Sequence, residues 1–337
     1  MRVPTSYDVA REAGVSQPTV SRALRDDRRV AATTRERVRE VASALGYVPS
    51  RRGRSLSTRT TGQIAVVVDD LANPFYMQLI ERLHTTLEGA DRRMVVLTDL
   101  LDRAGADARL LDGSIDGAIL TTALLGSPVP RELAARGLPV VLLNRVVDDP
   151  DANACTSRNA DGGRAVAEEL VSLGHRRIGA ILGPTDTSTS RDRERGFRDG
   201  LAAGGGHLAD ANLRRGPFTY ETGYQGLCDL LCGESSPSAI FCANDVIALG
   251  ALNAARALGI TVPARLTVFG FDDIEMAAWD VFRLSTVRQD LATMAGEAVS
   301  MLLGLILAPD RPPRRVTVPI TVVRRASHAP PPPEASE

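Results

Sequence analysis

The feature that most constrains this fold is a series of short apolar runs, separated by amphipathic stretches, between about residues 63 and 326. Continuous apolar runs are typical of strands buried on both faces, and amphipathic stretches such as residues 165–173 and 246–258 are typical of helices that cover them. The pattern predicts an α/β region with parallel sheets. The runs are IAVVV at 64–68, MVVL at 94–97, AIL at 118–120, VVLL at 140–143, IGAIL at 178–182, AIFC at 239–242 and TVFGF at 267–271.

The number of these runs predicts two lobes, because a single sheet would have to be long to hold all of them. Ligands of open α/β sheets bind at the carboxyl ends of the strands. Two such lobes facing each other would form a cleft. The Pro-rich end of the chain, residues 327–337, is expected to be disordered.

Residues 1–49 carry a different pattern, in which apolar residues recur at helical spacing in three short stretches. Each stretch is called a stripe here. Gly14 ends the first stripe, Ser16 is a good N-cap for the second, Pro18 is tolerated in its first turn, and Gly46 ends the third. A glycine turn between two short helices suits a helix-turn-helix. The basic, polar segment that follows has the composition of a linker.

The N-terminal part of the chain, or head, is basic, whereas the rest of the chain is acidic. Residues 1–60 carry 13 Arg against 6 Asp and Glu, whereas the remainder carries 27 basic and 35 acidic residues. A basic head indicates a polyanionic partner. In VSQPTVSRAL, residues 15–24, Gln17 could read adenine, Arg22 could read guanine, and Pro18 could touch a thymine methyl group. Ser16, Thr19 and Ser21 suit phosphate contacts. The alternative is an ordinary solvated helix.

Other classes of protein are disfavoured. No run approaches the roughly 18 apolar residues of a membrane helix, and the N-terminus lacks the apolar stretch of a secretory signal, so a cytoplasmic protein is expected. Cys228 and Cys232 are expected to be buried free thiols, not a metal pair. GGG at 204–206 is interpreted as a loop, and Walker, GxSxG and HExxH motifs are lacking. We therefore expect no catalytic residue, cofactor or metal.

Ordered motifs along the chain resemble a known family. They are YDVAREAGVSQPTVSRAL at 7–24, VxxxTRxRV at 30–38, LGYVPS at 45–50, GRSL at 53–56, NPF at 73–75, DGAIL at 116–120, LGHRRI at 173–178, CAND at 242–245, GFDD at 270–273 and LSTVRQD at 284–290. Over about residues 5–325 the sequence resembles the LacI/GalR family of transcriptional regulators. The resemblance implies a homodimer that binds a pseudo-palindromic operator, together with a two-lobed, periplasmic-binding-protein-like effector domain.

Domain boundaries follow from the resemblance and the composition together. We expect a helix-turn-helix domain at 1–49, a hinge segment at 50–61, and an effector-binding and dimerisation domain at 62–326. Within the last, the N-lobe would comprise about 62–159 plus 290–318, and the C-lobe about 160–288. The resemblance implies that about residues 50–57 of the hinge segment are disordered in the free protein and become helical on operator DNA.

The resemblance implies base reading by Gln17, Pro18 and Arg22, and it implies that Leu56 inserts into the central minor groove, where an intercalating side chain kinks the duplex. Three residues depart from the family pattern. Gly53 replaces a hinge alanine at a cost of about 1 kcal/mol, Arg52 replaces a residue that is often apolar, and Ala31 replaces a serine N-cap. The implied DNA-binding set is Tyr7, Ser16, Gln17, Pro18, Thr19, Ser21, Arg22, Thr34, Arg51, Arg54 and Leu56.

For the effector, the resemblance implies a sugar or sugar derivative. Asp272 would accept hydrogen bonds from hydroxyls, Arg193 and Asn244 would donate, and Phe218 could stack on an apolar sugar face. Arg158 stands where the family often has Asp. If it faced the cleft it would favour an anionic ligand, and if it faced solvent it would mean little. The implied effector-binding set is Asn73, Phe75, Arg193, Phe218, Asn244, Asp272, Trp279 and Gln289.

The sequence therefore predicts a DNA-binding regulator, a repressor by preference, that a small molecule switches allosterically. A purine or other corepressor, and activation in place of repression, are alternatives. A solute-binding protein without a regulatory role is a more distant one, because the basic head and the lack of a signal peptide argue against it.

Overall fold

The computed structural model describes residues 4–24, 26–47, 60–68, 70–98, 108–232 and 236–332. The chain forms two compact units, residues 1–61 and 62–337. The predictions for most of the hinge segment, including those for Arg51, Arg52, Gly53, Arg54 and Leu56, lie outside the described residues.

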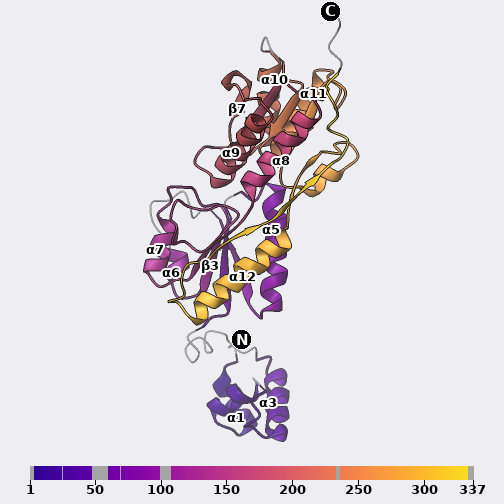
Figure 1. Ribbon diagram of the computed structural model, residues 1–337. Coiled ribbons are helices and arrows are strands. Elements are labelled where there is room, and N and C mark those ends of the chain that lie inside the picture. Colours follow the sequence, from indigo (N-terminus) through magenta and orange to yellow (C-terminus); the bar gives the residue numbers. More distant parts are fainter. Residues whose placement is uncertain are drawn as a thin grey trace, which may run out of the picture. The chain divides into compact units, whose positions relative to one another are not determined.

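The first unit, here called the head, contains the helices α1 (Ser6–Ala13), α2 (Gln17–Ala23) and α3 (Ala32–Ala44) (Figure 1). Gly14 ends α1 in the left-handed conformation, with φ of 63°, and the Ser16 side chain accepts a hydrogen bond from the Thr19 N–H at the start of α2. The predicted turn and the predicted N-cap are both confirmed. A small core joins the helices, formed by Val9, Ala10, Ala13, Val20, Ala23, Val30, Val38 and Ala42.

In the second unit, the first sheet is six-stranded and parallel, with the order β11-β5-β4-β3-β1-β2. Alternate residues of β1 face opposite sides, so Ile64 and Val66 pack in one hydrophobic cluster and Ala65 and Val67 in another. Helices α5 (Pro74–Gly89) and α12 (Leu291–Leu307) cover one face, and α6 (Ala108–Leu111) and α7 (Val129–Ala135) cover the other (Figure 1). The strands are β1 (Gln63–Val67), β2 (Arg93–Leu97), β3 (Gly117–Leu120), β4 (Val140–Leu143), β5 (Ala154–Ser157) and β11 (Arg315–Val318).

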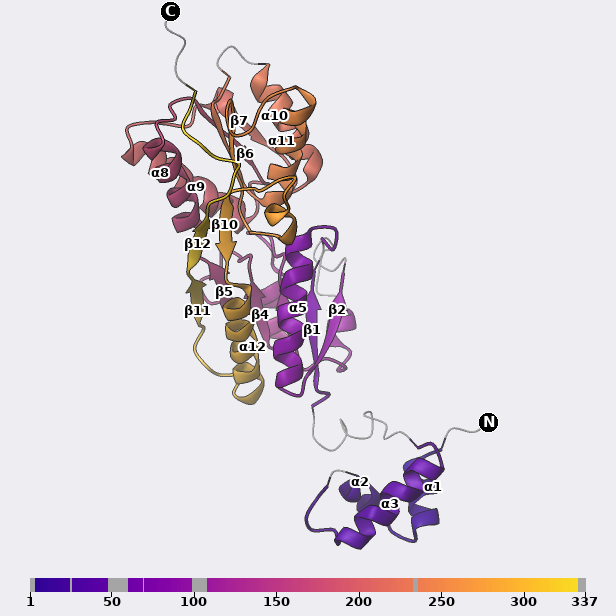
Figure 2. The same cartoon turned by 90° about the vertical axis from the view of Figure 1, so that its right-hand side faces the viewer.

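The second sheet is four-stranded and parallel, with the order β7-β6-β8-β9. The strands are β6 (Ile178–Leu182), β7 (Leu213–Arg215), β8 (Ala239–Cys242) and β9 (Thr267–Phe269), and two short 3₁₀ turns are η1 (Asp210–Asn212) and η2 (Glu275–Ala278). Figure 2 shows one pair of helices on each side of this sheet. One pair is α8 (Asn159–Ser172) and α9 (Ser188–Ala203), and the other is α10 (Tyr220–Leu231) and α11 (Asp245–Ala257).

Glycines allow the helices of one pair to approach closely. A Cβ on Gly196 of α9 would overlap the carbonyl oxygen of Ala160, and a Cβ on Gly163 of α8 would overlap that of Arg193. The two backbones are therefore in direct contact, and only glycine fits at these two positions.

The two lobes are joined by three stretches of chain. The first leads from β5 into α8, and the other two are β10 (Thr286–Gln289) and β12 (Ile320–Val323). These two strands pair antiparallel and lie between the two sheets (Figure 2). The β10–β12 pair is called the hinge ribbon below.

The expectation that the end of the chain is disordered is wrong for residues 327–332. Ser327 is buried, its hydroxyl donates to the Val268 carbonyl, and its own carbonyl accepts from the Val268 N–H. The Ala329 carbonyl lies 2.8 Å from Nε2 of His175. Composition predicted disorder because it cannot show that this backbone bonds alongside β9. Residues 333–337 lie outside the described residues.

The seven predicted strands are confirmed, whereas β5, β7, β10, β11 and β12 were missed. The missed strands carry polar or charged residues and lie at sheet edges, next to an edge, or in the hinge ribbon, so they lack a continuous apolar run. Within the described part of the chain, no helix is both long and apolar enough to cross a membrane.

Candidate DNA-binding surface and effector pocket

Helix α2 presents one polar face. It buries Val20 and Ala23 in the core of the head, while Pro18 and Arg22 are exposed. Gln17 is half-buried, and its Nε2 donates to the Ser6 hydroxyl at 3.4 Å. Tyr7 of α1 is 73% exposed. Residues three or four apart share a face of a helix, so the apolar and polar sets lie on opposite sides of α2.

The hydroxyl side chains of the predicted set are partly engaged within the head. Ser16 Oγ lies 2.8 Å from Thr19 Oγ1 and also caps α2. Ser21 and Thr34 are half-buried. Ala31 precedes α3 without a side-chain capping bond, which confirms the predicted weak cap.

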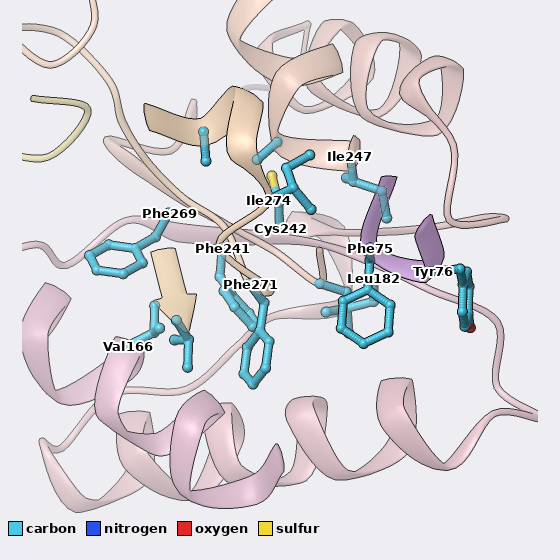
Figure 3. Packing of buried hydrophobic residues seen from close by; sticks show 14 of the residues in the cluster. Phe75, Tyr76, Val166, Leu182, Phe241, Cys242, Ile247, Phe269, Phe271 and Ile274 are labelled. Atoms are coloured by element: carbon cyan, nitrogen blue, oxygen red, sulfur yellow. The ribbon is translucent and has the colours of Figure 1, made fainter. Parts of the chain in front are cut away.

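In the second unit, six of the eight predicted effector residues line one small cavity between the lobes: Asn73, Phe75, Arg193, Phe218, Asn244 and Asp272. Each follows the carboxyl end of a strand, as expected for open α/β sheets. Phe75 and Tyr76 of α5 belong to the same hydrophobic cluster as Leu182 of β6, and Figure 3 shows these side chains. The lobes therefore meet around this cavity, which is called the pocket below.

Asp272 is the centre of a buried polar network. Its Oδ1 accepts hydrogen bonds from Nη2 of Arg193 at 3.0 Å and from Nε2 of Gln289 at 2.7 Å. Gln289 lies on the hinge ribbon, and its Oε1 accepts from the Ser157 hydroxyl. Burial raises the pKa of Asp272, whereas the charge of Arg193 and the hydrogen bonds from Gln289 and Arg193 oppose that rise. The network ties α9 to the hinge ribbon through one carboxylate.

Arg193 is held on several sides. Its Nε donates to Asn159 Oδ1, its Nη1 donates to the Ala243 carbonyl, and its guanidinium carbon lies 3.7 Å from the centroid of the Phe271 ring. Only 3% of the residue is exposed. A guanidinium held in this way is preorganised to offer its remaining N–H groups to a ligand.

The two asparagines also have a local structural task. Asn73 caps α5, because its Oδ1 accepts from the Phe75 N–H, and Asn244 caps α11 by accepting from the Ile247 N–H. Both side chains are therefore fixed at the pocket by the helices that they cap.

Three residues considered from the sequence lie outside the pocket lining. Trp279 is 49% exposed, and Gln289 reaches the pocket only through Asp272. The Arg158 side chain is 53% exposed, lies 3.8 Å from Asp161, and belongs to no part of the lining. Of the two alternatives for Arg158, the structure supports the solvent-facing one.

Four lining residues were missed in the sequence: Tyr76, Asn144, Arg145 and Thr189. The signal was available for two of them, because Asn144 and Arg145 directly follow the predicted strand VVLL. Tyr76 follows Phe75 in a helix and is buried, which raises the pKa of its phenol.

The pocket measures about 20 Å³, which is room for about one water molecule. Pockets for drug-sized ligands measure about 300–1,000 Å³. A sugar can therefore enter only if the lobes or the lining side chains move. Among the residues that the structure describes, no group of three or more His, Cys, Asp or Glu is arranged to hold a metal ion. Cys228 and Cys232 are free thiols, but the expectation that both are buried is wrong, because Cys228 is half-buried and Cys232 is exposed.

Comparisons with known proteins agree with both units. Residues 5–50 match the model of bacterial regulatory proteins of the lacI family, and residues 167–328 match a periplasmic binding protein-like domain. The chain is 32% identical to the transcriptional regulator CelR of Thermobifida fusca, over 97% of this chain and 98% of that protein. It is also 32% identical to the transcriptional repressor CytR of Escherichia coli, over 89% of each chain.

Solved structures give the same result. The lac repressor dimer bound to operator and an anti-inducer superposes with a TM-score of 0.85 at 28% identity, over 97% of this chain and all of that one. The CelR–cellobiose complex superposes with a TM-score of 0.73 at 30% identity, over 96% and 99% of the two chains. These relatives are regulators and not enzymes. With its helix-turn-helix head and two-lobed α/β domain, the chain belongs to the LacI family of DNA-binding transcriptional regulators.

Proposed function

We propose that the protein represses transcription by binding a pseudo-palindromic operator as a homodimer, and that a sugar or sugar derivative in the pocket releases it. The observation that carries this proposal is the convergence of six predicted effector residues from both lobes on one cavity. A carboxylate, a guanidinium, amides and aromatic rings suit a polyol. The lac repressor was solved as a dimer on operator and CelR with cellobiose, which supports the proposal. Because its partner is chromosomal DNA, the protein would act in the cytoplasm.

The proposed switch uses the network around Asp272. Hydroxyl groups of an effector compete with Gln289 and Arg193 for Oδ1 of this carboxylate, and Gln289 belongs to the hinge ribbon. An effector that binds better to one arrangement of the lobes shifts the equilibrium by its difference in affinity for the two arrangements. Operator and effector then weaken each other's binding by the same factor.

On the DNA side, Gln17, Pro18 and Arg22 would read bases in the major groove, and Ser16, Thr19, Ser21 and Thr34 would contact the backbone. An Arg22→Ala variant is expected to lose about 1–3 kcal/mol of operator affinity and to relax base choice at one position. Its free energy of unfolding should not change, because Arg22 is exposed. Unchanged base selectivity would refute the reading role.

The decisive experiment selects an operator from a random DNA library with the full chain. It then measures operator affinity, by fluorescence anisotropy, in the presence of each member of a panel of sugars, sugar acids and sugar phosphates. We expect at least one sugar to weaken operator binding by about 5- to 150-fold. A Phe218→Ala variant should bind operator normally but lose this response. Tyr220→Ala, which removes an aromatic side chain 42% exposed and outside the pocket, should retain it. If no sugar, sugar acid or sugar phosphate of the panel changes operator affinity, the proposal fails.

A further inference from the structure

Arg145 is a pocket residue that connects the two lobes. It follows β4 in the first sheet, and its guanidinium carbon lies 5.3 Å from the centroid of the Phe218 ring. Phe218 comes from the segment between β7 and α10 of the other lobe. The Phe218 ring is the surface on which a sugar face could stack. Arg145 therefore lies where a ligand on this ring would meet it.

No acidic residue in the described part of the chain forms an ion pair with Arg145, and the nearby carboxylate Asp272 pairs with Arg193. Within the described ranges, its guanidinium makes no ion pair or hydrogen bond, and its Nε is buried without a partner. Arg193, the other lining arginine, pairs with Asp272. Asp272 is the one carboxylate in the described lining of the pocket, so two guanidinium groups face a single acid.

Acidic residues near the pocket are engaged elsewhere. Asp148 pairs with Arg191, Asp70 accepts a hydrogen bond from the Asn73 N–H, and Asp245 accepts from the Ile274 N–H and the Thr286 hydroxyl. Arg145 is half-buried, and its buried Nε has no partner among the described residues. A partly buried charge that makes no ion pair loses solvation without compensation, which is costly. A ligand that supplies a negative charge would offset this cost, whereas a neutral ligand would not.

Asn144, the neighbour of Arg145, also has a polar atom without a hydrogen-bond partner within the part of the chain that the structure describes. One end of its amide lies 3.5 Å from the Tyr76 hydroxyl, and the other end, Oδ1, is buried without a partner. A hydroxyl group can donate or accept, so it satisfies the free end of an amide in either orientation. A ligand that carries both a hydroxyl group and an anionic group would therefore satisfy Asn144 and Arg145 together.

We propose that the effector is a polyhydroxy compound with an anionic group, a sugar acid or a sugar phosphate, and that Arg145 binds the anion while Asn144 binds an adjacent hydroxyl. This inference rests on the proposed effector role of the pocket. Arg145 therefore sets the ligand's charge, a role that Arg158 cannot fill from its half-exposed position beside Asp161. Arginine suits both anions, because its planar fork matches carboxylate and phosphate.

The test measures binding to the full chain by calorimetry, with matched sets of probes: glucose, gluconate, glucuronate and glucose 6-phosphate, then the galactose and ribose equivalents. At least one anion is expected to bind about 10- to 100-fold more tightly than its neutral parent, as charge-assisted hydrogen bonds allow. Preference for the carboxylates or for the phosphates within a set identifies the anion.

Three variants test whether Arg145 is the residue that causes the preference for the anion. Arg145→Gln should remove the preference for the anion, Arg145→Lys should keep part of it, and Arg158→Gln, which removes the same charge outside the pocket, should leave it unchanged. The thermal unfolding midpoint of each variant verifies that the two-lobed unit is folded. The inference is overturned if no acid or phosphate binds, if a neutral sugar binds as tightly as its anions, or if Arg145→Gln keeps the preference.

These outcomes separate the inference from the proposed function. A neutral sugar that releases operator while the anions do not would sustain the repressor mechanism and overturn the assignment of Arg145. An anion that binds through Arg145 without changing operator affinity would sustain the assignment and overturn the mechanism.

Discussion

In the head, one short helix displays Gln17, Pro18 and Arg22, whereas in the two-lobed unit the pocket residues come from the ends of several strands, from Asn73 to Asp272. The head needs only a local helix and a small core to position its side chains. The pocket needs both sheets, their helices and a buried ion pair. Substitutions in the head should therefore act locally, whereas substitutions at the pocket should affect the stability of the whole unit.

The largest effect is expected at Asp272. An Asp272→Asn variant leaves the buried charge of Arg193 without its partner, so the free energy of unfolding should fall by about 3–5 kcal/mol in urea titration. The double variant Asp272→Asn/Arg193→Met removes both charges and should be more stable than the single variant. A loss below about 1 kcal/mol for the single variant would mean that the ion pair is not needed for stability.

The next effect concerns the contact between α8 and α9. Gly196→Ala places a methyl group against the Ala160 carbonyl and should destabilise the two-lobed unit by about 1–3 kcal/mol or more. Gly296→Ala is the matched control, because a Cβ there meets nothing within 4 Å in the middle of α12. That control should stabilise by about 0.5–1 kcal/mol. Equal thermal unfolding midpoints of the two variants would contradict the close approach of the helices.

A pH dependence should come from Asp245. Its burial, and then the nearby charge of Asp272, raise its pKa from 3.8 to about 7. Between these values the folded protein holds a proton that the unfolded chain has released, so stability should fall as pH rises. The contribution is about 1.4 kcal/mol per pH unit between pH 5 and 6.5.

The contribution of Asp245 is measured as the difference in pH-dependent stability between the parent protein and an Asp245→Asn variant. Burial lowers the pKa of His175, so this group acts in the opposite direction near pH 6. Urea titrations of the parent and of Asp245→Asn at pH 5 and 6.5 cancel the contribution of His175. The asparagine can still accept from the Ile274 N–H. A pH slope that is the same in both proteins would exclude an unusual pKa for Asp245.

The smallest effect is expected in the head. Ala31→Ser supplies the missing side-chain cap of α3 and should stabilise that helix by about 0.5–1 kcal/mol. Ala32→Ser, one residue inside the helix, is the control and should not stabilise it. Amide hydrogen exchange of α3 in the full chain measures both. Slower exchange in the two-lobed unit as well would break the distinction between local and distributed effects.

The difference between the units also explains what the sequence could predict. Helix ends in the head depend on single residues, such as Gly14 and Ser16, and these were predicted correctly. The buried strands of the two sheets can be predicted because each is a continuous run of apolar residues. Strands such as β5 (ACTS) and β10 (TVRQ) carry no such signal, because their pairing is decided by residues far away in the chain.

Contacts between residues far apart in the chain also explain why some pocket residues were predicted and others were missed. The predicted residues came from the family resemblance, and six of them lie at the pocket. Arg145 could have been chosen because it follows a predicted strand. However, only the folded structure shows that it reaches Phe218, more than 70 residues later in the chain, and that its charge is left without an acid partner among the described residues.

The pairing of β11 with β5 has a consequence for synthesis. Residues 315–318 complete the sheet that begins at residue 63, and the strands β6 to β9 of the other sheet lie between β5 and β11 in the chain. On the ribosome, β5 stays unpaired on one side until residues 315–318, made about 160 residues later, have emerged. Pairings so distant in sequence are slow to form and leave unpaired strand edges exposed meanwhile. Until β11 has been made, the open edge of β5 therefore exposes the nascent chain to aggregation.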